Sequence, residues 1–226
     1  MVHPAAVQIK AGRVLIDGDL TIPLKAAGLV VFAHGSGSSR FSGRNQYVAQ
    51  VLQRSGYATL LLDLLTARED AIDQQTREYR FDVDRLGQRV VAAIDWAASH
   101  PEAAPLPVAS FGASTGAAAA LIAAAERPEV VRAVISHGGR PDLAGFALSK
   151  VQAPTLLIVG GDDEPVIELN RAAMRRMRAP VELEIVPGAT HLFEERGALE
   201  LVSLLAVRWC AKYLGGSPKL PSSWEP

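Results

Sequence analysis

Runs of almost continuous apolar residues recur along this 226-residue chain and alternate with segments of helical pattern. An apolar run without polar alternation predicts a strand that is covered on both faces. Regular alternation of such strands with helices predicts an α/β fold, a doubly wound and mostly parallel sheet with right-handed crossovers. The expected strands are residues 29–33, 58–62, 107–111, 131–135, 155–159 and 181–186.

Helices and an N-terminal hairpin complete the expected architecture. Residues 8–24 alternate polar and apolar side chains around Gly12 and the pair Asp17-Gly18, which predicts an antiparallel hairpin at an edge of the sheet. Only one short helix fits between the strands that end near Ser136 and begin at Thr155, so no cap domain is expected. The expected helices are residues 45–55, 82–99, 115–126, 167–177 and 195–214.

Length and composition favour one domain that acts on a small molecule. The chain is long enough for a single α/β domain, expected over residues 1–214, with an irregular tail over residues 215–226. Its 23 Lys and Arg nearly balance 24 Asp and Glu, and no basic stripe indicates a nucleic-acid surface. The apolar runs are too short to span a bilayer, and the first residues lack a leader pattern, so no membrane association and a cytoplasmic location are expected.

The pentapeptide Gly112-Ala113-Ser114-Thr115-Gly116 lies where an expected strand turns into an expected helix. In such a G-x-S-x-G turn the serine takes a strained backbone conformation that lifts its hydroxyl above the sheet. Larger side chains at the flanks would clash, so both flanking positions must be glycine, as they are here. The motif also arises by chance in glycine- and alanine-rich chains, but its place between strand and helix favours a nucleophile at Ser114.

A nucleophilic serine needs a base, and the base needs an acid that orients it. In folds of this kind the chain order is Ser, then Asp or Glu, then His, each on a loop after a strand. His191 satisfies this order, because it follows the expected strand 181–186. His34 and His137 also follow strands and could line the site, but their places in the chain disfavour them as the base. His3 lies near the terminus and His100 at the end of an expected helix.

The acid is expected in the loop after strand 155–159, where Asp162, Asp163 and Glu164 are consecutive. The spacing from Asp163 to Val166 resembles that of the acid loop in folds of this kind and favours Asp163. Asp162 would then be a turn residue or a partner for exposed backbone amides. Asp63 is a lower-ranked alternative, more consistent with a structural role.

The negative charge that develops during acyl transfer needs two backbone amide donors. One is expected from Thr115, the residue after the nucleophile, and the other from Ser36 in the glycine-rich loop 34–40. A phosphate-binding loop is the alternative, but neither G-x-G-x-x-G nor a G-K-[ST] ending is present. His34, His137 and Arg40 are candidates for contact with the substrate. Arg40, Arg44 and Arg140 could bind a substrate carboxylate, with solvated surface arginines as the alternative.

Four ordered motifs carry a family resemblance: His34-Gly-Ser-Gly37, Gly112-Ala-Ser-Thr-Gly116, Gly160-Gly-Asp-Asp163 and Gly188-Ala-Thr-His191. Together they resemble α/β-hydrolases, and the lidless size looks like the branch related to dienelactone hydrolase. Dienelactone hydrolases proper carry a cysteine at the nucleophile position, where this chain has Ser114. The one cysteine, Cys210, lies in the last expected helix and is expected to be a packed core thiol.

The resemblance implies a serine hydrolase that cleaves a small or short-chain carboxylic ester through an acyl-enzyme. Ser114 would attack, His191 would transfer the proton, Asp163 would orient His191, and the amides of Ser36 and Thr115 would hold the oxyanion. No metal and no organic cofactor is implied. The alternatives are a thioesterase, lactonase or acyltransferase with the same three residues, and a binding module in which they are vestigial.

Overall fold

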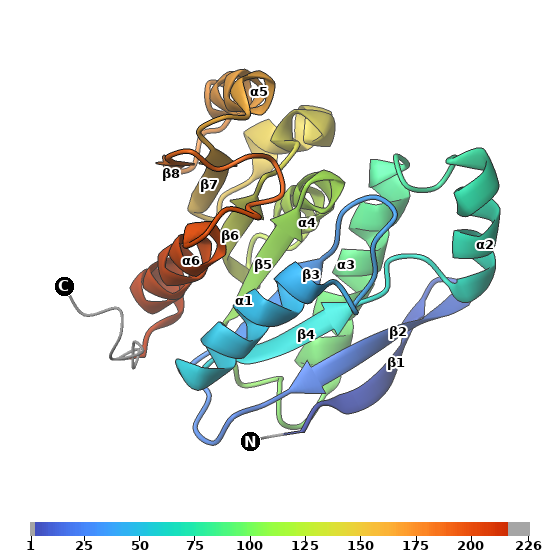
Figure 1. Ribbon diagram of the computed structural model, residues 1–226. Coiled ribbons are helices and arrows are strands. Elements are labelled where there is room, and N and C mark those ends of the chain that lie inside the picture. The colour runs from blue at the N-terminus through green and yellow to red at the C-terminus, as the bar shows by residue number, and fades with distance from the viewer. Residues whose placement is uncertain (1–2, 217–226) are drawn as a thin grey trace.

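Eight strands form one sheet in the computed structural model, which describes residues 3–216 (Figure 1). The strand order is β1-β2-β4-β3-β5-β6-β7-β8. The strands from β3 to β8 run parallel, whereas β2 pairs antiparallel with both β1 and β4. The predicted doubly wound, mostly parallel sheet with an N-terminal hairpin is therefore confirmed. The strands are β1 (Ala5–Ala11), β2 (Val14–Thr21), β3 (Leu29–Ala33), β4 (Ala58–Leu62), β5 (Val108–Ala113), β6 (Val131–His137), β7 (Thr155–Gly160) and β8 (Val181–Val186).

Helices cover both faces of this sheet because successive strand residues point to opposite sides. On one face, Val31 and Leu60 pack in an apolar cluster with residues of α3 and α4. On the other, Phe32 and Leu61 pack with residues of α1 and α6. The helices are α1 (Gly43–Arg54), α2 (Ala67–Thr76), α3 (Val83–Ser99), α4 (Thr115–Glu126), α5 (Glu164–Met174) and α6 (Ala198–Leu214), with a 3-10 segment η1 (Pro141–Lys150).

Some expected element positions are wrong. The hairpin turns at Gly12 and Arg13, and Asp17-Gly18 lies inside β2, where Gly18 pairs with Val7 of β1 and Leu62 of β4. Helix α5 begins at Glu164, three residues before the expected start, because Pro165 fits the first turn of a helix, where no amide hydrogen is needed. Helix α6 begins at Ala198, three residues later than expected.

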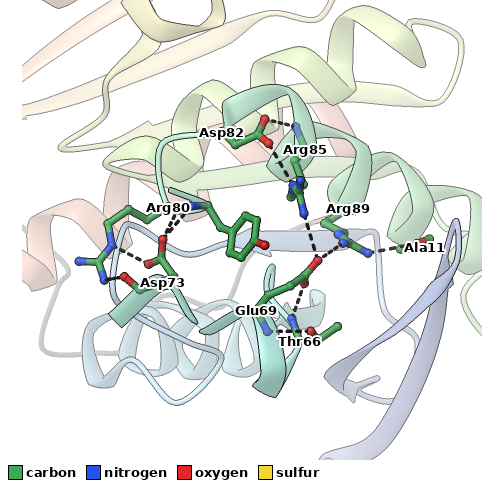
Figure 2. A network of polar contacts seen from close by, with 9 residues as sticks. Ala11, Thr66, Glu69, Asp73, Arg80, Asp82, Arg85 and Arg89 are labelled. Carbon is green, nitrogen blue, oxygen red and sulfur yellow. Dashed lines mark hydrogen bonds and ion pairs between the residues drawn. The ribbon is translucent and has the colours of Figure 1, made fainter. Parts of the chain in front are cut away.

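Helix α2 is absent from the expected helices, because no apolar periodicity predicts it. Asp73 is its only buried residue. Its N-terminus carries a capping box, in which Thr66 accepts a hydrogen bond from the Glu69 amide and the Glu69 carboxylate accepts one from the Thr66 amide. Polar contacts, drawn in Figure 2, therefore fix this helix where apolar burial usually would.

Two carboxylates of α2 anchor it to its surroundings (Figure 2). Glu69 contacts Arg85 and Arg89 of α3 at 3.3 and 2.8 Å, and Arg89 also donates to the Ala11 carbonyl of β1 at 3.1 Å. Asp73 accepts hydrogen bonds from the amide and Nε of Arg80 at 2.8 and 2.6 Å. These contacts hold the segment between β4 and α3 beside the carboxyl ends of the strands.

The connection between β6 and β7 contains only η1, so no cap domain is inserted there. In residues 3–216, none of the helices combines the length and the apolar character needed to cross a membrane. Of the expected C-terminal tail, residues 217–226 lie outside the described part of the chain.

Candidate active site

Ser114 occupies the sharp turn between β5 and α4 with φ of 50° and ψ of −121°. A positive φ at a residue other than glycine costs on the order of 1–3 kcal/mol and persists only where neighbours hold it. Here the Ser114 amide donates to the His137 carbonyl at 3.2 Å, and the Ser114 carbonyl accepts from the Arg140 amide at 3.0 Å. The hydrogen bonds on both sides fix the turn that presents the serine.

The two glycines of the motif allow the backbone segments around Ser114 to approach closely. A Cβ at Gly112 would lie 2.4 Å from the Cα of Ala117, and a Cβ at Gly116 would lie 2.2 Å from the Ala33 carbonyl oxygen. Both distances are shorter than any real contact of a Cβ atom, and the neighbouring atoms belong to the backbone. Only glycine fits at either position.

His191, in the loop after β8, is held by one carboxylate. Its Nδ1 lies 2.6 Å from Oδ2 of Asp163, and the Asp163 side chain is 14% exposed. Asp163 stands at the N-cap position of α5, yet its side chain makes no capping hydrogen bond. The neighbouring Asp162 and Glu164 are exposed. The structure thus brings Asp163 to the histidine, and a donating Nδ1 leaves Nε2 free to accept a proton.

Ser114 and His191 line one pocket of about 240 Å³ at the carboxyl ends of β3, β5 and β6. In residues 3–216, no hydrogen bond joins the Ser114 hydroxyl to His191; such bonds often tighten only when substrate is bound.

The wall of the Ser114 pocket also includes Ser42 and Asn45 from the start of α1, which the sequence analysis does not identify as site residues. Ser42 caps α1 by accepting from the Asn45 amide, and a serine before an expected helix could have signalled this.

Ser36 lines this pocket, and its hydroxyl oxygen lies 3.0 Å from that of Thr115, the residue after Ser114. Among the described residues, neither backbone amide donates a hydrogen bond to another group. Thr115 begins α4, so its amide belongs to the group of N-H donors that a helix leaves unpaired at its start. The two amides are therefore available to a negatively charged oxygen.

His34 and Arg40 make structural contacts in place of lining the Ser114 pocket. The His34 Nδ1 lies 2.9 Å from the Gly35 carbonyl oxygen, and its Nε2 accepts from the Leu64 amide at 3.0 Å. Burial lowers the pKa of His34, consistent with this neutral form.

Arg40 forms an ion pair with Asp63. His34, Arg40 and Asp63 line a neighbouring hollow of about 760 Å³, which shares Ser38 and Ser42 with the Ser114 pocket.

The remaining candidates divide between the pocket and its surroundings. His137 lines the pocket, and burial, Arg44 and His191 lower its pKa to about 3. Arg44 also lines the pocket and lies 3.8 Å from Glu194. Arg140 instead pairs with Asp142 through two hydrogen bonds of 2.8 Å.

Cys210 lies in α6 and is not among the residues that line the Ser114 pocket. Cys210 is fully buried in α6, and burial raises the pKa of its thiol to about 12. A buried, protonated thiol is a poor nucleophile. Within residues 3–216, no group of three or more His, Cys, Asp or Glu side chains is arranged to hold a metal ion.

Comparison with known proteins agrees with this architecture. Residues 16–203 match the model of the dienelactone hydrolase family. The chain is 55% identical to a dienelactone hydrolase of Anabaena variabilis of known structure, with a TM-score of 0.92 over 94% of this chain and 98% of that one. An alpha-beta serine hydrolase homologue from Coxiella burnetii shares 21% identity and the fold, with a TM-score of 0.74 over 92% of this chain and 98% of that one.

Two Mycobacterium tuberculosis proteins, from strains CDC 1551 and H37Rv, are each 55% identical over 93% of this chain. Their names assign them provisionally to the phosphoribosyl transferases. This chain spans 46% of their length, about half of each curated relative. The match over residues 16–203 and the high identity to the Anabaena protein show that the chain belongs to the dienelactone hydrolase family, a branch of the α/β-hydrolases.

Proposed function

We propose that this hydrolase is a serine esterase that cleaves small carboxylic esters through an acyl-enzyme. Ser114 attacks the acyl carbon while His191 takes its proton, and the oxyanion binds to the amides of Ser36 and Thr115. His191 then returns the proton to the departing alcohol. A water molecule, activated by His191 in the same way, releases the acid and restores Ser114.

The observation that carries the proposal is the position of Ser114 on a strained turn in one pocket with a histidine that is already paired with a carboxylate. A serine hydroxyl is a weak nucleophile until a base stands beside it, and the base works best when an acid fixes its tautomer. The unpaired amides of Ser36, which lines the same pocket, and of Thr115, next to Ser114, supply the remaining requirement.

The relatives support a hydrolase. The Anabaena protein is named for dienelactone hydrolysis, whereas the provisional phosphoribosyl transferase name belongs to proteins of which this chain spans about half. Serine in place of the cysteine of dienelactone hydrolases proper favours ordinary esters as substrates. The balanced charge of the chain supports a free small molecule, and not nucleic acid or a membrane, as the partner, and we propose a cytoplasmic location.

Labelling with a fluorophosphonate probe tests this proposal directly, because the probe reacts preferentially with an activated serine. We expect the probe to label the wild type but not Ser114→Ala. The control is Ser149→Ala, at an exposed serine of η1, which should be labelled like the wild type. Turnover of p-nitrophenyl acetate should fall about 10³-fold or more in Ser114→Ala, because the three residues act as one unit. Normal labelling of Ser114→Ala would show that the nucleophile lies elsewhere.

A further inference from the structure

His137 is a buried histidine whose ring nitrogens have no hydrogen-bond partner among the described residues. The residue is 5% exposed and stands at the end of β6. Buried polar atoms in folded proteins are almost always paired, and an unpaired one bears the full penalty of lost hydration. A ring with two such atoms indicates a partner that joins it when the protein works.

The place of the ring shows where this partner would bind. His137 lines the same pocket as Ser114 and His191. Its backbone carbonyl accepts the hydrogen bond from the Ser114 amide, so the residue is fixed relative to the nucleophile. The ring packs against Phe111 and Phe193, with centroid distances of 5.8 and 4.5 Å, and these apolar rings offer no hydrogen bond. Both ring nitrogens are buried in this structure, and the pocket that the residue lines is the side from which a polar group would reach them.

The surroundings also define the charge of the ring. Burial, the Arg44 guanidinium and His191 hold the pKa of His137 at about 3, so the ring is neutral throughout the physiological range. None of the residues that line the described pocket is Asp or Glu. A neutral imidazole presents one N-H donor and one acceptor nitrogen. A hydroxyl can pair with either nitrogen, because it both donates and accepts a hydrogen bond.

We propose that His137 is a specificity-determining residue that hydrogen bonds to a hydroxyl group of the substrate, close to the reacting ester. This inference rests on the proposed esterase function of the same pocket. A hydroxyl can pair with one ring nitrogen in either tautomer, and the ring lines the same pocket of about 240 Å³ as Ser114. Its side chains Ser38, Ser42 and Asn45 add further polar surface. A site built in this way discriminates strongly against an analogue that lacks the hydroxyl.

Matched ester pairs, each differing by a hydroxyl in place of a methyl group, test the proposal. Ethyl glycolate against ethyl propionate places the difference on the acyl side, and 2-hydroxyethyl acetate against propyl acetate places it on the alcohol side. The ratio of kcat/KM within each pair is measured for the wild type and His137→Phe, in which a ring of similar shape has no nitrogen. The control is His100→Phe, at a histidine at the end of α3 that stacks on Trp96 outside the pocket.

We expect the wild type and His100→Phe to favour the hydroxylated ester of one pair at least tenfold beyond the ratio for alkaline hydrolysis. His137→Phe should bring that ratio to within about twofold of the alkaline value, and His137→Gln, which keeps a donor and an acceptor, should retain part of the preference. The pair that responds identifies the side of the ester that carries the hydroxyl.

Two results would overturn the inference. One is a wild type that shows no enrichment over alkaline hydrolysis in either pair, a measurement that needs no variant. The other is a His137→Phe variant with a higher Tm and unchanged kcat/KM ratios within both ester pairs. That result would show that the His137 ring contributes only to packing. Either result, in a wild type that the fluorophosphonate labels at Ser114, leaves the esterase function intact. A wild type without labelling contradicts the proposed function itself.

Discussion

Asp163 stands at a helix N-cap position, but its carboxylate contacts a histidine and does not cap the helix. An aspartate at an N-cap position normally accepts a hydrogen bond from the first turn of its helix. The Asp163 carboxylate makes no such bond and lies against Nδ1 of His191 at 2.6 Å. Asp162, next to it, is exposed, and its backbone amide bonds to the Ala189 carbonyl oxygen at 2.9 Å. The backbone contact of Asp162 therefore helps to orient the loop that presents Asp163.

We expect Asp163→Asn to lower kcat for a short p-nitrophenyl ester by about 10²–10⁴-fold, because a neutral amide cannot stabilise the imidazolium and favours the wrong tautomer. Asp162→Asn is the matched control and should keep kcat within about threefold, since the exposed carboxylate has no contact with His191. Steady-state kinetics on both variants, with circular dichroism to confirm folding, decide the point. A larger loss in Asp162→Asn would move the acid to that residue.

At the scale of elements, the sequence predicts helices and strands well where apolar burial forms them and poorly where polar contacts do. The strands from β3 to β8 lie within two residues of their expected ends, and α4 lies where its alanine-rich run places it. Apolar periodicity does not predict helix α2, because the one buried side chain of this helix is the carboxylate of Asp73. The pair Thr66 and Glu69, three residues apart, is the local signal that could have located its start.

We expect Asp73→Asn to lower the free energy of unfolding by about 1.5–3 kcal/mol, the range for a hydrogen bond to a charged group. Asp73 is fully buried and binds the amide and guanidinium of Arg80 together with the Tyr79 amide, contacts that Figure 2 shows in part. Asp95→Asn is the control, because Asp95 pairs with Arg127 at the surface and should contribute less than about 1 kcal/mol. Urea unfolding at pH 7 measures both.

The same residue gives a pH dependence. Burial raises the pKa of Asp73, but the hydrogen bonds from Arg80 and Tyr79 outweigh it and hold the pKa below the ordinary value of 3.8. A lowered pKa in the folded state stabilises the protein above pH 3.8 and ceases to do so as the pH falls through the folded-state value. Below pH 4 the wild type should therefore lose stability more steeply than Asp73→Asn. Parallel curves would show that Asp73 does not titrate in this way.

At the scale of the whole molecule, the sheet gathers at one edge what the sequence keeps far apart. Different strands lead to Ser36, Ser114 and His191. The carboxyl ends of parallel strands lie at the same edge of the sheet. Motif order therefore suffices to predict these candidates. Contacts between side chains depend on three-dimensional packing. The sequence alone therefore could not predict that Arg40 and His34 line the neighbouring hollow, or that the ring nitrogens of His137 have no partner among the described residues.

The open architecture leads us to expect a small substrate. No cap covers the sheet between β6 and β7, and the Ser114 pocket holds about 240 Å³, below the usual range for sites of drug-sized ligands. A methylene that stays in water forfeits about 0.8 kcal/mol of binding, or roughly fourfold in kcat/KM relative to a buried one. The pocket therefore offers little affinity for a long acyl chain.

We expect kcat/KM across p-nitrophenyl acetate, butyrate, octanoate and palmitate to level off or fall beyond about four to six acyl carbons, where methylenes no longer find apolar surface. The alkaline hydrolysis rate of each ester provides the reference for intrinsic reactivity, and concentrations below the onset of micelles remove interfacial effects. If palmitate proved the best substrate under these conditions, an apolar channel would have to open beside Ser114, where the structure places Ser38, Arg44 and Asn45.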